Sequence, residues 1–183
     1  MREDFWRSLN ESRLSGNWKF WENVFPEASV MDMTCLIEIN QYLSVNGGKN
    51  AFSTHQPLLG PVHHDSRVKP FYKEFIENYD RVSGEVVWNS LLFFSLSDQH
   101  ASFDMHSDGE TVLLIQGYGE VGMVVKHAND PGNHQLLHLK TGDVLLMPPG
   151  TIHKPIPLGP RVTLSIGALP EKINNSSMNM NRA

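Results

Sequence analysis

The spacing of apolar side chains divides the chain into a helical first part and a strand-rich second part. Over Met33–Leu43 apolar residues recur every three or four positions, which is typical of a helix with one buried face. Asp32 stands at the N-cap position of this helix, and Asn46-Gly47-Gly48 is a stop signal. A second helix is predicted over Lys69–Tyr79, where Pro70 suits the first turn.

From Gly84 onward, short runs rich in β-branched and aromatic residues alternate with turn residues. The predicted strands are Val86–Phe94, Ser102–Met105, Thr111–Ile115, Val121–Val125, Gln135–Leu139, Val144–Met147 and Val162–Ile166. The segments 117–119, 129–133, 140–143 and 148–150, rich in Gly, Pro and Asn, are predicted turns. A strand about every ten residues favours an antiparallel sandwich or barrel over alternating βαβ units.

The length of 183 residues and the hydrophobic content of 40% predict one structural domain with a real core. We expect three parts within it. Residues 1–83 form a helical region that packs on the barrel, 84–170 form the β core, and 171–183 form a polar, flexible tail.

Composition narrows the function classes without naming one. The net charge of -5 gives no sign of a nucleic-acid partner. Cys35 is the single cysteine, so no intrachain disulfide can form and a reducing compartment is the simpler expectation. No stretch approaches the roughly 18 apolar residues of a membrane span, and Met1–Trp6 lacks the apolar run of a signal peptide. We therefore expect a cytoplasmic protein without a membrane partner.

Two motifs carry candidate chemistry: His106-Ser107-Asp108 and the later His153. Two imidazoles and one carboxylate are the ligand set of non-haem Fe(II) oxygenases, and this set leaves one face of the metal open for substrate and O₂. The i, i+2 spacing of His106 and Asp108 places both side chains on one face of a strand. His153 follows a Pro148-Pro149-Gly150 turn, which can aim its side chain back into a barrel mouth.

These motifs also carry a family resemblance. Gly142-x5-Pro148-x-Gly150-x2-His153 matches the second sequence motif of cupins. His106-x-Asp108, followed by the apolar run 112–115 and the glycine turn 117–119, resembles the cupin-type 2-oxoglutarate oxygenases, the group that contains the JmjC hydroxylases and demethylases. The resemblance covers roughly residues 84–170. It implies a mainly β, double-stranded β-helix (jelly-roll) barrel with the N-terminal helices packed on it, Fe(II), and 2-oxoglutarate as co-substrate.

The resemblance leaves the 2-oxoglutarate anchor open. JmjC-like enzymes usually hold the far carboxylate with a lysine just after the glycine turn, and residues 119–122 contain none. Lys126, further along, is one alternative. Arg161-Val162-Thr163 resembles the Arg-x-Ser/Thr motif of other 2-oxoglutarate oxygenases. A guanidinium holds a carboxylate through two parallel hydrogen bonds, and Thr163 shares the strand face of Arg161. A strand-end salt bridge is the alternative role for Arg161.

Weaker candidates lie nearby. Glu110 could serve as a fourth metal ligand in place of the cupin glutamate, although Gly109 between it and Asp108 could break the strand register. The cluster His63-His64-Asp65 could form a second metal site, but a solvated loop is the stronger interpretation. The aromatic N-terminal region around Trp6 suggests core packing or a homodimer interface.

The leading hypothesis is therefore an Fe(II)- and 2-oxoglutarate-dependent dioxygenase, a hydroxylase of unknown substrate. The small size favours a small-molecule or short-peptide substrate. Two alternatives remain: a metal-binding cupin that acts on a small metabolite without 2-oxoglutarate, as a dioxygenase or isomerase, and a non-catalytic ligand-binding cupin. Asp108 stands where ordinary cupins have histidine, which favours the oxygenase. A buried carboxylate without a metal would also be costly, which argues against the non-catalytic alternative.

Overall fold

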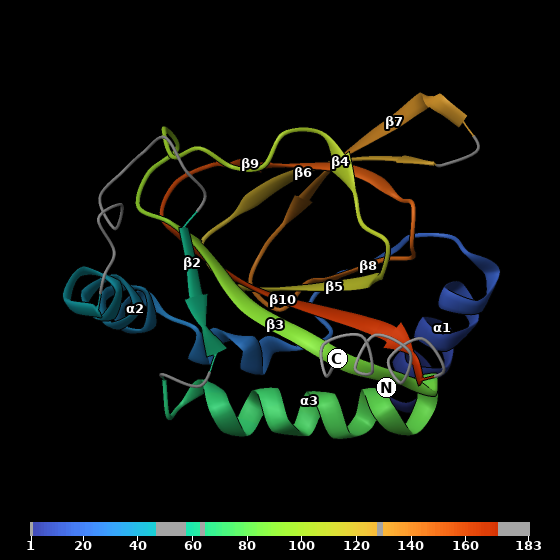
Figure 1. Cartoon of the computed structure of the whole chain (residues 1–183), viewed down its shortest axis with the longest axis horizontal. Coiled ribbons are helices and arrows are strands. Elements are labelled where there is room, and N and C mark those ends of the chain that lie inside the picture. The colour runs from blue at the N-terminus through green and yellow to red at the C-terminus, as the bar shows by residue number, and fades with distance from the viewer. Residues whose placement is uncertain (1, 47–57, 63–64, 128–129, 172–183) are drawn as a thin grey trace, which may run out of the picture.

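The computed structural model describes residues 2–46, 58–62, 65–127 and 130–171. Two β-sheets face each other, and helices cover the outer side of the larger one (Figure 1). The elements are α1 (Arg2–Ser15), β1 (Lys19–Trp21), η1 (Pro26–Val30), α2 (Met33–Asn46), β2 (Leu58–Pro61), α3 (Val68–Ser83), β3 (Glu85–Ser95), β4 (His106–Ser107), β5 (Thr111–Tyr118), β6 (Val121–His127), β7 (Asp130–Leu139), β8 (Val144–Met147), β9 (Ile152–Pro157) and β10 (Arg161–Pro170).

The strand order is that of a jelly roll. The six-stranded sheet runs β1-β8-β5-β10-β3-β2 and the four-stranded sheet runs β4-β9-β6-β7. Every strand pair is antiparallel. From β3 onward the chain changes sheet at every connection except the one between β6 and β7, so inward side chains of both sheets line one interior. The predicted mainly β barrel with N-terminal helices is confirmed.

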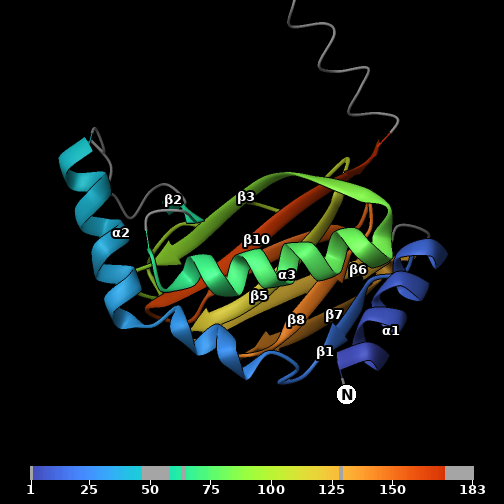
Figure 2. The same ribbon diagram turned by 90° about the horizontal axis from the view of Figure 1, so that it is seen from below.

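The helices pack against the outer face of the larger sheet. Figure 2 shows α3 lying across this sheet, with α1 and α2 at its flanks. Phe5, Trp6, Phe25 and Phe75 meet edge to face or at a tilt between the helices and the sheet, with ring centroids 4.9 to 5.8 Å apart. Trp6 is thus buried within the chain. Asp32 caps α2 as predicted, because its carboxylate accepts a hydrogen bond of 2.9 Å from the amide of Cys35.

Both faces of the central strand β5 are apolar over residues 112–115. Along β5, Leu113 and Ile115 join the core under the helices, while Val112 and Leu114 pack inside the barrel with Met123 of β6. Each face therefore has its own partner layer, and the strand shows no alternation of apolar and polar residues. The inner layer leaves room for a cavity at the barrel's interior.

The structure corrects several predicted elements. Residues 102–105 form no strand; the ladder begins only at His106, whose backbone pairs with β9. The strands β1, β2 and β9 were not predicted, since they are short or interrupted by proline. β5 continues through Tyr118, so the turn lies at Gly119 (φ +67°), where a Cβ would come within 2.0 Å of the Pro160 carbonyl oxygen. Residues 63–64 and the tail 172–183 lie outside the described residues.

Among the helices of the described residues, none is both long and apolar enough to cross a membrane.

Candidate metal centre and co-substrate pocket

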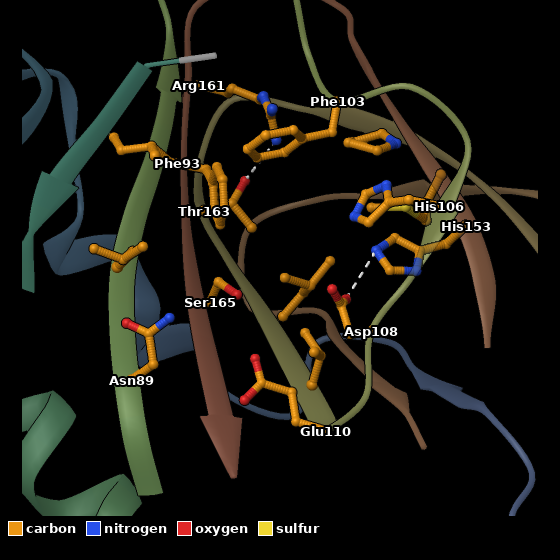
Figure 3. Close-up of a pocket in the computed structure, with 16 residues that line it drawn as sticks. Asn89, Phe93, Phe103, His106, Asp108, Glu110, His153, Arg161, Thr163 and Ser165 are labelled. Atoms are coloured by element: carbon orange, nitrogen blue, oxygen red, sulfur yellow. Dashed lines mark hydrogen bonds and ion pairs between the residues drawn. The ribbon is translucent and has the colours of Figure 1, made fainter. Parts of the chain in front are cut away.

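Three predicted ligands meet at the edge of the smaller sheet. β4 pairs with β9 so that His106 lies directly opposite His153, and Asp108 follows β4 at once. One ligand atom from each of the three side chains lies within 4.8 Å of the others. Nε2 of His153 is 3.6 Å from an Asp108 carboxylate oxygen (Figure 3). This is an open three-ligand cluster with the donor set of a facial iron site.

Backbone carbonyls orient both imidazoles. Nδ1 of His106 lies 2.6 Å from the carbonyl oxygen of Asp104, and Nδ1 of His153 lies 3.1 Å from that of Thr151. A carbonyl can only accept, so each Nδ1 carries the proton and each Nε2 keeps its lone pair for a metal. Burial, together with the neighbouring His106, lowers the pKa of His153. The ring is therefore neutral, which is the form that binds metal.

The turn between β8 and β9 fixes the third ligand. Gly150 (φ +81°) donates its amide to the carbonyl oxygen of Asp108 at 2.8 Å. The Thr151 hydroxyl closes the turn by donating to the Pro148 carbonyl oxygen at 2.7 Å. The Pro-Pro-Gly turn was predicted to return the chain toward the site, and it has a second role. It also bonds the segment that carries Asp108 to the segment that carries His153.

A cavity of about 300 Å³ adjoins the three ligands. Inward side chains of β3, β5 and β10 form one wall, and side chains of β6 and β9 face them from the smaller sheet (Figure 3). Leu114, Met123 and Phe93 make much of this wall apolar. A concave, mostly apolar cavity with a few polar groups is the usual form of a small-molecule site.

Arg161 is a buried cation in this cavity. Its side chain is at the start of β10, the residue is only 4% exposed, and it forms no ion pair with any described residue. Nη1 donates to the Thr163 hydroxyl at 3.1 Å, and Nε has no hydrogen-bond partner in the described part of the chain. Burial lowers the pKa of Arg161 to about 10. The strand-end salt bridge is therefore not found, and a guanidinium with spare donors faces the cavity.

Gln116 is a neighbour that the sequence analysis missed. Thr163 donates its hydroxyl hydrogen to the Gln116 side-chain oxygen at 2.6 Å. The Gln116 amide donates to the carbonyl oxygens of Tyr118 and Gly119 at 2.7 and 3.1 Å. These bonds hold Thr163 so that its lone pairs meet Arg161. The signal was present in the sequence, since Gln116 is one polar residue inside an otherwise apolar, fully buried run.

Other candidates lie elsewhere. Lys126, the alternative anchor, is not among the residues that line the cavity; along β6 its neighbour Val125 is the buried, inward residue. Glu110 lines the cavity but is not part of the three-residue cluster, and it accepts a hydrogen bond from the Trp88 indole. Burial raises the pKa of Glu110. Asp65 is buried and holds Arg67 at 2.6 Å, so it has a structural role.

Comparison with known proteins shows which family and which solved structures this chain resembles. Residues 70–176 match the JmjC domain family. No curated protein sequence matches the chain. The ribosomal oxygenase YcfD from Escherichia coli is 25% identical, with a TM-score of 0.51 over 62% of this chain and 31% of its own. YcfD has been solved with cobalt and succinic acid and with cobalt and 2-oxoglutarate. This chain therefore spans about a third of the YcfD length.

Two more distant structures share the fold over most of the chain. A Pseudomonas putida prolyl-4-hydroxylase is 12% identical, with a TM-score of 0.61 over 89% of this chain and 97% of its own. The α-ketoglutarate-dependent non-haem epimerase SnoN from nogalamycin biosynthesis is 10% identical, with a TM-score of 0.59 over 91% and 83%. At these identities the likeness concerns the fold alone.

Proposed function

This chain belongs to the JmjC domain family, and from that premise we propose that it is an Fe(II)- and 2-oxoglutarate-dependent dioxygenase that hydroxylates its substrate. One observation carries the proposal: an open His-Asp-His cluster lines the same cavity as a buried guanidinium that forms no ion pair with any described residue. A metal explains the first feature and a dicarboxylate explains the second.

The donor set fits Fe(II). His106 and His153 present neutral nitrogen atoms, and Asp108 adds a hard anionic oxygen. When bound, Fe(II) would activate O₂, the oxidant: 2-oxoglutarate would supply two electrons and take one oxygen atom as it becomes succinate and CO₂, and the other oxygen atom would enter the substrate. His106, Asp108 and His153 would hold the metal at one wall of the cavity.

The remaining residues bind and orient the co-substrate. Arg161 would hold the far carboxylate of 2-oxoglutarate through two parallel charge-assisted hydrogen bonds. Thr163, held in turn by Gln116, keeps the guanidinium plane turned toward the cavity. Leu114 and Met123 exclude water around the keto-acid end, which strengthens each polar contact there. A cupin that works without 2-oxoglutarate would have no partner for Arg161.

An anaerobic titration tests the proposal. Fe(II)-loaded protein is titrated with 2-oxoglutarate while the weak visible charge-transfer band of the chelate is followed. We expect a band that saturates in the wild type and is absent in His106→Ala. Stoichiometric iron without a band would contradict the proposal and favour a 2-oxoglutarate-independent cupin.

A further inference from the structure

The outer face of the smaller sheet is not covered by any described helix. Figure 1 shows β4, β6, β7 and β9 on the side of the molecule away from α3, and the helices pack on the larger sheet. Met123 and Val125 of β6 point into the barrel and are buried there. Because side chains alternate along a strand, Gly122, Val124 and Lys126 lie on the outer face. This face therefore has no partner layer within the described part of the chain.

Apolar side chains form the middle of this outer face. Leu136 of β7 is 68% exposed and Ile156 of β9 is 36% exposed. The strand register places Leu136 beside Val124 and Ile156 beside Gly122. Both side chains lie next to the bare backbone of Gly122, where a Cβ atom would be 3.4 Å from Cβ of Ile156 and 3.8 Å from Cδ1 of Leu136. The three strands thus share one exposed apolar patch, a feature that marks interaction sites.

Opposite charges stand at the two ends of this patch along β6. At one end Lys126 forms no ion pair with any described residue. At the other end a carboxylate oxygen of Glu120 lies 2.7 Å from Nε2 of His138, which is paired with Gly122, so Glu120 is also on the outer face. Six residues of strand separate the two charges by roughly 20 Å.

The order of these features along β6 is complementary to itself, with its midpoint at Met123. Consider a half-turn about an axis that lies in the interface and crosses β6 at right angles. It places Glu120 opposite Lys126 of a second copy, and Lys126 opposite Glu120 of that copy. Face-to-face sheets pack about 10 Å apart, a gap that both long side chains can bridge. A half-turn about an axis along β6 would place like charges opposite each other, which is unfavourable.

We propose that the outer face of the smaller sheet binds a second copy of this chain in the antiparallel arrangement just described. The apolar patch forms the centre of the interface, and a pair of Glu120 with Lys126 closes each end. A homodimer through the aromatic N-terminal region is not expected, because Trp6 is buried within the chain. His106 and His153 point to the opposite face of the sheet, so the inference does not depend on the proposed function.

The size of the face predicts a weak dimer. Three strands spaced about 4.8 Å apart and roughly 20 Å long cover less than the roughly 800 Å² that each partner buries in a standard stable interface. Sedimentation equilibrium of the full chain tests this. The monomer should predominate at about 5 µM and the dimer at about 1 mM. Raising the salt from about 50 mM to about 500 mM should weaken the association severalfold, because salt screens exposed charges.

Charge reversal locates the contact. Glu120→Lys or Lys126→Glu alone turns both symmetry-related pairs from attractive to repulsive, and each should raise the Kd of the dimer at least about tenfold. The double variant, which carries both reversals, restores both pairs and should return the Kd to within about threefold of the wild type. Leu136→Glu places a charge in the apolar centre and should leave the chain monomeric.

Matched controls carry the same changes on the far side of the molecule. Lys73 and Glu77 form an exposed pair on α3, so Lys73→Glu and Glu77→Lys alter the net charge equally without touching the smaller sheet. Both should leave the Kd of the dimer unchanged. Circular dichroism checks that every variant is folded, as expected for substitutions at exposed positions.

A wild type that stays monomeric over the whole range at low salt would overturn the inference. A dimer that the single reversals do not weaken would also overturn it, because the contact would then lie on another face. Weakening by both single reversals without recovery in the double variant would contradict the antiparallel pairing of Glu120 with Lys126.

Discussion

The buried charge of Arg161 is expected to lower the free energy of unfolding of the apo protein. Binding of 2-oxoglutarate is expected to offset this loss. The perturbation is Arg161→Met, which keeps the length of the side chain and removes the charge. In the apo protein the guanidinium is buried, donates a hydrogen bond to the Thr163 hydroxyl, and forms no ion pair with any described residue. The variant should therefore be more stable than the wild type in the absence of 2-oxoglutarate, and should bind it poorly.

The magnitudes follow from the burial. A pKa lowered from its ordinary value to about 10 corresponds to roughly 3 kcal/mol against the charged form in the folded protein. Losing the bond to Thr163 costs about 1 kcal/mol, so the net gain is about 2 kcal/mol, or a Tm increase of roughly 5 °C. Removing one partner of a buried charge pair costs about 3 kcal/mol of binding, so 2-oxoglutarate affinity should fall at least about 100-fold.

Thermal unfolding and calorimetric titration of Mn(II)-loaded protein measure both effects. At a 2-oxoglutarate concentration 100 times its Kd, the wild type should gain about 2.7 kcal/mol, and the variant almost none at the same concentration. Lys126→Met is the matched control, because it removes a cation from the same barrel outside the cavity. It should change neither quantity by much.

Unchanged affinity in Arg161→Met would refute the assignment of the anchor. An apo variant less stable than the wild type by more than about 1 kcal/mol would refute the claim that the buried charge is uncompensated. The two results are independent, because the first concerns the bound state and the second concerns folding.

Three further changes test the site and its scaffold. His106→Ala should lower bound iron at least about tenfold by elemental analysis while secondary structure by circular dichroism stays unchanged; full iron occupancy would contradict its role. Tyr79→Phe removes the 2.5 Å hydrogen bond from the phenol to the buried Glu85 carboxylate, and should cost about 1 to 3 kcal/mol in urea unfolding; no loss would show that the bond has no net value. Burial opposes ionisation of Asp65, but the hydrogen bonds from Arg67 outweigh it and lower its pKa, so the pair stabilises the protein at neutral pH and this stability is lost as the pH falls through the folded pKa. Asp65→Asn should therefore be less stable at pH 7 and show a flatter loss of stability below about pH 4; an unchanged acid limb would contradict this.

The three residues of the candidate metal centre could be selected from the sequence because their chemistry is rare in combination. His106, Asp108 and His153 are polar residues in β-rich surroundings, and their spacing fits strands. The spacing of His106 and Asp108 and the turn before His153 explain only in part why the three side chains lie close together. The decisive contact is the direct pairing of β4 with β9, and β4 is only a two-residue strand that no local pattern reveals.

The cavity end at Glu110 could not be placed from the sequence. Its position depends on a bulge at Trp88 and on the bare backbone at Gly167, two residues far apart in the chain that meet only through the register of β3 and β10. The position of Lys126 outside the cavity could not be predicted for a related reason: its face of β6 is decided by the register of the whole hairpin. Local patterns predict which residues can do chemistry, and long-range register decides which of them meet.

The inward positions of β10 lie at fixed distances from one another. Arg161, Thr163 and Ser165 stand at alternate positions, and alternate residues on a strand are about 7 Å apart. Under the proposed function the metal would be held by other strands, so the position of the cation along β10 would set which length of 2-oxo dicarboxylate can reach both the metal and the cation. The spacing between alternate residues on the strand is much larger than the length that one carbon atom adds to the dicarboxylate. A change in preferred chain length would therefore come from replacing Arg161 by a shorter or longer cation at the same position, rather than from moving the cation along the strand.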